Sequence, residues 1–62
     1  MVSYYYQGYR LWISDFMFYE VYPSAIYSPE GKDVWVGCTH EPAKEEADMR
    51  NFIEKRIQER MI

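Results

Sequence analysis

Apolar and polar positions follow two different patterns along this chain, and the change falls at about Thr39. Residues 3–39 form short runs of Tyr, Trp, Phe, Val and Ile that are separated by turn residues, a pattern typical of strands. Residues 41–62 lack glycine and are rich in Glu, Lys, Arg, Ala, Met and Ile, a composition typical of a helix. The pattern therefore predicts a sheet followed by a helix.

The first part predicts three strands, over about residues 3–13, 16–27 and 34–39. We expect Ser14-Asp15 to form the turn between the first two strands. Pro23 cannot donate a ladder hydrogen bond, so the second strand should end, bulge or lie at an edge there. The run Ser28–Asp33 predicts a loop, in which Gly31 suits a position of positive φ.

Alternation with a period of two divides the first strand into two faces. We expect its core face to carry Tyr5, Gln7, Tyr9, Leu11 and Ile13, and its second face to carry Tyr4, Tyr6, Gly8, Arg10 and Trp12. Across the hairpin, Arg10 should lie near Glu20. A cross-strand ion pair is the expected role of these two charges, and an interface hot spot at Arg10 is the alternative.

The second part predicts one helix over about residues 41–60. Thr39 can cap its start, and Pro42 suits the first turn because an N–H there has no helical partner. Oppositely charged residues four apart should pair along its surface, as in Glu46 with Arg50. An apolar stripe with helical spacing should face the sheet, formed by Met49, Phe52, Ile53 and Ile57.

The resulting fold class is α+β, with a three-stranded antiparallel β-meander followed by one C-terminal helix, β-β-β-α. Sixty-two residues allow a single small domain, residues 1–62. The helix offers about four large apolar side chains, whereas the sheet carries eleven of the twelve aromatic residues. One sheet face should therefore remain uncovered.

An uncovered apolar face of this size usually marks an interface. We expect the interaction surface to consist of residues from the second face and the following strand: Tyr4, Tyr6, Arg10, Trp12, Phe16, Phe18 and Tyr22. The expected partner is a second copy of the chain, as a homodimer, or another protein.

Charge weighs against a nucleic-acid partner. The chain has ten acidic and seven basic residues, a net charge of −3, and its first forty residues contain only two bases, Arg10 and Lys32. Proteins that bind nucleic acids draw much of their affinity from clustered Lys and Arg at phosphates. Stacking of single-stranded bases on the Tyr and Trp side chains is kept as an alternative function.

Cys38 and His40 are the only candidate catalytic or metal-binding pair. A thiol near a helix N-terminus can have a lowered pKa, but zinc usually needs four ligands and no second pair is present. We therefore expect no catalytic residues, no metal site, no cofactor and no enzymatic activity.

A single cysteine cannot form an intramolecular disulfide, so a reducing compartment, the cytoplasm, is expected. The sequence has no signal-peptide pattern and no apolar run long enough to span a bilayer, so no membrane partner is expected. The favoured hypothesis is a small non-enzymatic interaction or regulatory module. An inhibitor of a host protein, of the kind found in phages and prophages, is a further alternative.

Overall fold

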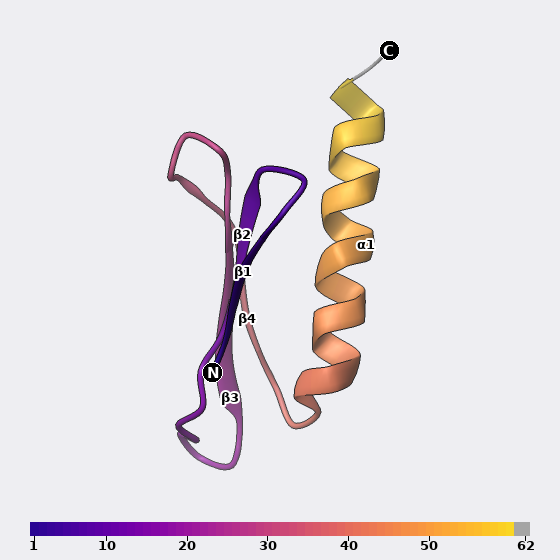
Figure 1. Cartoon of the computed structure of the whole chain (residues 1–62). Helices are drawn as coiled ribbons and strands as arrows, with labels where there is room; N and C mark the ends of the chain where they lie inside the picture. The colour runs from indigo at the N-terminus through magenta and orange to yellow at the C-terminus, as the bar shows by residue number, and fades with distance from the viewer. Residues whose placement is uncertain (61–62) are drawn as a thin grey trace.

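A four-stranded antiparallel sheet and one helix form the protein in a computed structural model that describes residues 1–60 (Figure 1). The strands are β1 (Val2–Tyr6), β2 (Tyr9–Ile13), β3 (Tyr22–Tyr27) and β4 (Asp33–Thr39), and the helix is α1 (Pro42–Arg60). Each strand pairs with the next along the chain, in the order β1-β2-β3-β4. The α+β class is confirmed, with four strands where the sequence pattern predicted three.

The extra strand arises at Gln7 and Gly8, which split the predicted first strand into β1 and β2. Both residues have positive φ, 50° and 86°, as in the two-residue type I′ turns that connect tight hairpins. Tyr6 pairs with Tyr9 across this turn. Gly8 therefore serves the turn, where glycine adopts positive φ without a steric penalty.

The connection between β2 and β3 is longer than the predicted Ser14-Asp15 turn. Residues 14–21 lie outside the strands apart from a bridge between Phe18 and Val21, and these two residues exchange backbone hydrogen bonds of 2.8 and 3.0 Å. The prediction of a strand from residue 16 to residue 27 is therefore wrong for its first six residues. Pro23 lies near the start of β3, where its carbonyl accepts a hydrogen bond from the Ser14 N–H.

The loop between β3 and β4 forms where it was predicted. The Ser28 carbonyl accepts a hydrogen bond from the Gly31 N–H at 2.8 Å, and the Ser28 N–H donates to the Lys32 carbonyl at 2.7 Å. Gly31 has the predicted positive φ, 87°. A type I turn followed by a glycine in this conformation is a common hairpin loop.

Helix α1 begins at Pro42, one residue after the start predicted from the sequence. The Glu41 carbonyl accepts the first helical hydrogen bond, from the Glu45 N–H, while Thr39 Oγ1 accepts one from the Glu41 N–H. Glu41 is thus the N-cap residue, and Thr39 stabilises the turn before it. Arg50 pairs with Glu46 at 3.2 Å as predicted.

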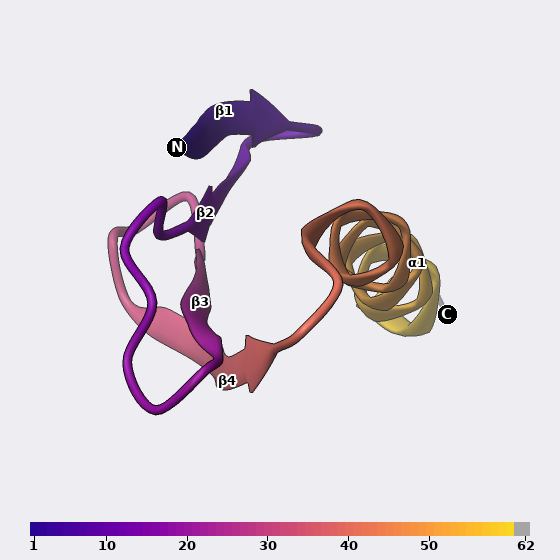
Figure 2. The ribbon, with the colours of Figure 1, turned by 90° about the horizontal axis from the view of Figure 1, so that it is seen from below.

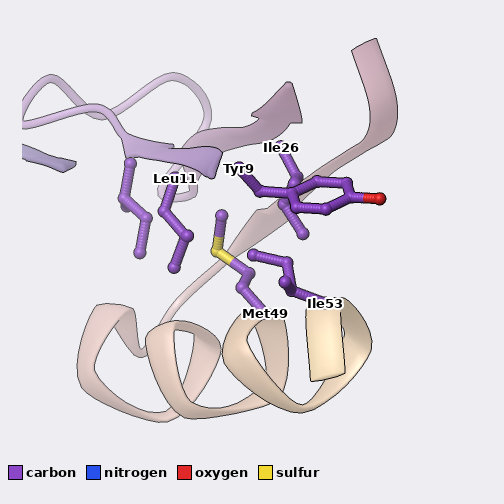
Figure 3. Close-up of a cluster of buried hydrophobic side chains, with 6 residues drawn as sticks. Tyr9, Leu11, Ile26, Met49 and Ile53 are labelled. Atoms are coloured by element: carbon purple, nitrogen blue, oxygen red, sulfur yellow. The ribbon is translucent and has the colours of Figure 1, made fainter. Parts of the chain in front are cut away.

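The core lies between α1 and one face of the sheet. Its buried side chains are Tyr9, Leu11, Ile13, Ile26, Met49 and Ile53, five of which are labelled in Figure 3. Phe52 and Ile57 pack against this cluster, so the predicted helical stripe is confirmed. We call the opposite side of the sheet the free face, because α1 covers only one side (Figure 2).

Candidate interaction surface

Three residues of the predicted interaction surface lie on the helix side of the sheet. Tyr4, Tyr6 and Tyr22 are half-buried and pack against the core cluster. The Tyr6 hydroxyl also donates a hydrogen bond to Glu54 of α1. Their placement on the uncovered face is therefore wrong, and Tyr5, which was predicted in the core, is 75% exposed.

Tyr4 is held by a small polar network with the helix. Its hydroxyl donates to Glu46 Oε2 at 2.8 Å and accepts from Arg50 Nη1 at 3.3 Å. Burial, together with the hydrogen bond to Glu46, raises the pKa of Tyr4 above its ordinary value of 10.0. These contacts tie β1 to α1 and use the Tyr4 hydroxyl inside the fold.

Arg10 and Trp12 lie on the free face, as predicted. Arg10 is paired with Tyr5 of β1 on one side and with Tyr27 of β3 on the other, so one cation lies between two tyrosines. Arg10 Nε and Nη2 approach Ser3 Oγ at 3.3 and 3.1 Å, which fixes the guanidinium over the sheet. The predicted ion pair with Glu20 is wrong, because Glu20 lies in the connection at the far end of β2.

A hollow of about 290 Å³ lies on the free face beside Tyr5, Arg10 and Tyr27. We call it the tyrosine–arginine hollow; it is lined by Tyr5, Arg10, Tyr27, Ser28, Pro29 and Gly31. Its volume lies just below the range of roughly 300–1,000 Å³ that is typical of small-molecule sites. A space of this size with aromatic walls and a cation suits a single side chain of a partner.

The largest exposed apolar group is the segment Phe16–Tyr19, which we call the apolar loop. These four consecutive side chains are exposed by 73%, 53%, 63% and 98%. Figures 1 and 2 show the connection that carries them on the side of the sheet away from α1. The predicted Phe16 and Phe18 are thus at the surface, in a loop where a strand was expected.

The tip of the apolar loop has an unusual backbone. Tyr19 and Glu20 have φ values of 50° and 68°, although neither is glycine, asparagine or aspartate. Such conformations cost about 1 kcal/mol or more for ordinary residues. The Glu20 carbonyl lies 2.9 Å from Nδ1 of His40, which links the tip to the segment that leads into α1. The fold therefore holds a strained turn that presents large apolar groups to solvent.

Cys38 and His40 lie near the start of α1. Both line an open hollow of about 470 Å³ near the start of α1, together with Thr39, Glu41, Lys44, Glu45 and Asp48. Cys38 is exposed, and His40 Nδ1 is engaged with the Glu20 carbonyl. Within residues 1–60 no group of three or more His, Cys, Asp or Glu residues is arranged to hold a metal ion.

The exposed large apolar residues outside the predicted interaction surface are Met1, Tyr5, Met17, Tyr19 and Val36. The turn signal at Gln7-Gly8 could have indicated that Tyr5 lies on the exposed face of the sheet. A two-residue hairpin turn places the paired residues Tyr6 and Tyr9 on the same face, so the alternation before the turn is inverted relative to the alternation after it.

Comparisons with known proteins give no relative for this chain: no family model, no curated protein and no solved structure matches it. Among the residues that the structure describes, no helix has the length and apolar character needed to cross a membrane.

Proposed function

We propose that this chain is a small non-enzymatic protein-interaction module that binds itself or another protein through its free face and the apolar loop. The observation that carries the proposal is the apolar loop, in which four consecutive large side chains are each more than half exposed. Large exposed apolar groups that lie together usually mark an interaction site. The single free thiol is compatible with a reducing cytoplasm as the place of action.

Two further features support binding through this surface. Tyr, Trp and Arg are the residue types most often found at interface hot spots, and the free face carries Tyr5, Arg10, Trp12 and Tyr27. The strained turn at Tyr19-Glu20 is the second feature, because backbone strain is often concentrated at functional positions.

The test is the double variant Phe16→Ser/Phe18→Ser, with Lys44→Ser/Lys55→Ser on exposed positions of α1 as the matched control. Sedimentation at micromolar concentration measures self-association, and capture from the native host with the immobilised chain measures binding to another protein. We expect the phenylalanine variant to weaken the association at least tenfold and the lysine variant to leave it unchanged. Equal binding by both variants would contradict the proposal.

Base stacking on the same aromatic residues is the competing use of this surface. Trp12 lies on the free face, so its fluorescence should respond if a single-stranded oligonucleotide binds there at low salt. A saturable change in this fluorescence would favour nucleic-acid binding over the protein partner proposed here.

A further inference from the structure

The free face has opposite features at its two ends. The connection that carries the apolar loop lies at the end of the sheet where β2 finishes, and the loop of residues 28–32 lies at the other end (Figure 1). The tyrosine–arginine hollow lies next to the loop of residues 28–32. Both connecting loops lie on the side of the sheet away from α1 (Figure 2). A protruding group and a recess thus occupy the same side of the molecule, separated by the length of the strands.

The two ends of the free face also differ in charge. Asp15 and Glu20 bracket the apolar loop and are the only charged side chains in residues 14–21. The N-terminal ammonium lies 3.7 Å from Asp15 at an exposed position, and the Glu20 carboxylate has no ion pair within residues 1–60.

The hollow carries the complementary charge, Arg10. No carboxylate lies within 4.0 Å of its guanidinium in the part of the chain that the structure describes. Glu30, Lys32 and Asp33 are exposed in and beside the neighbouring loop, but none of them lines the hollow. Arg10 is therefore the charge that a group entering the hollow would meet.

We propose that the free face is a two-fold interface between copies of this chain, in which the apolar loop of each copy enters the tyrosine–arginine hollow of the other. This inference deepens the proposed function by naming the partner as a second copy. A two-fold axis in the plane of the interface, running across the strands through the middle of the free face, places the loop of one copy opposite the hollow of the other, and the reverse.

In this arrangement a phenylalanine ring of the apolar loop lies between Tyr5 and Tyr27 and against the Arg10 guanidinium. Aromatic rings bind each other and cations in such positions. Asp15 and Glu20 of the same loop then approach Arg10 of the other copy, so the contact is complementary in shape and in charge.

An interface of standard size needs only a modest share of the surface of this chain. A standard interface buries about 800 Å² on each partner, roughly one sixth of the 4574 Å² that this chain exposes. The free face and its two loops occupy one whole side of the sheet, and self-docking covers its exposed apolar residues in a single contact.

Charge reversal tests the arrangement by sedimentation equilibrium across the micromolar range. We expect a dimer for the wild type and at least a tenfold weaker dimer for Arg10→Glu and for Asp15→Lys/Glu20→Lys. The triple variant, which exchanges the charges, should recover dimerisation toward the wild-type value. Lys55→Glu and Asp48→Lys/Glu59→Lys, on exposed positions of α1, make the same charge changes away from the interface and should have no effect.

The outcomes separate this inference from the proposed function. A wild-type monomer at about 100 µM, or a dimer that is insensitive to Arg10→Glu, overturns the two-fold arrangement. If Phe16→Ser/Phe18→Ser then still abolishes binding to another protein, the interaction module stands without self-docking. If the phenylalanine variant changes no association of any kind, both are overturned.

Discussion

The tyrosine side chains of this protein have different structural roles. Tyr9 fills the core, Tyr4 and Tyr6 connect β1 to carboxylates of α1, and Tyr5 is exposed beside Arg10. Composition alone treats them as equivalent strand residues. Their different tasks follow from the face on which each lies and from whether a helix residue can accept a hydrogen bond from the hydroxyl.

Tyr4 gives a pH-dependent contribution to stability whose sign follows from its environment. Because the pKa of Tyr4 is raised in the folded chain, the phenol keeps its proton to a higher pH than in the unfolded chain. The contribution of Tyr4 to the unfolding free energy is complete below about pH 10, and it is lost as the pH rises through the pKa that Tyr4 has in the folded chain. We expect the difference in unfolding free energy between wild type and Tyr4→Phe to be constant at neutral pH and to shrink in strong alkali.

Urea titrations monitored by circular dichroism at several pH values measure this difference. Tyr5→Phe, which removes a hydroxyl from the free face, is the matched control. A difference between wild type and Tyr4→Phe that stays constant from pH 7 to about pH 11 would contradict the interpretation.

The elements show which features of the fold the sequence could predict. Helix α1 and its apolar stripe were predictable, and its first residue to within one position, because helical periodicity continues without interruption from Pro42. The first strand was not predicted correctly, because the alternation of its aromatic residues shows no break at Gln7-Gly8. The turn inverts the face of every residue before it, and Tyr4 and Tyr6 were therefore assigned to the wrong surface.

The connection between β2 and β3 was mispredicted for a different reason. Phe16–Val21 has strand composition, yet the turn at Tyr19-Glu20 uses positive φ without a residue that normally indicates it. Arg10, Trp12, Phe16 and Phe18 were correctly expected at the surface. The hollow beside Arg10 depends on the neighbouring loop of residues 28–32, a relation between elements that local periodicity does not contain.

Strand β4 contains a close contact that depends on glycine. A Cβ atom at Gly37 would lie 2.6 Å from Cη2 and 2.7 Å from Cζ2 of Trp35, so the indole occupies the space above the glycine. We expect Gly37→Ala to displace the ring and to lower the unfolding free energy by about 1–3 kcal/mol, the usual cost of overpacking. Urea unfolding and near-ultraviolet circular dichroism report the two effects.

A double-mutant cycle isolates this contact from the general effect of alanine in a strand. In a Trp35→Val background, Gly37→Ala should cost much less than in the wild type. Equal costs in both backgrounds would show that the indole does not require the glycine.

The whole molecule is small for a chain that folds alone. A domain of about 60 residues buries only about 60% of its unfolded surface, which leaves a narrow margin of stability. Here one helix covers one side of a four-stranded sheet, and large apolar side chains of the apolar loop remain in contact with water. Self-association through the free face would remove that surface from water and add to the stability of each copy.

This coupling predicts that thermal stability depends on protein concentration. A ligand that binds only the folded state raises its stability by RT ln(1 + [L]/Kd), about 2.7 kcal/mol at a hundred times the Kd, and a second copy acts as such a ligand. Because about 1 kcal/mol shifts the midpoint of a domain this size by roughly 4–8 °C, the wild-type Tm should rise by several degrees between 2 and 200 µM. Arg10→Glu should show a much flatter dependence, while Lys55→Glu should follow the wild type. A Tm that is independent of concentration in all three proteins would contradict self-association through the free face.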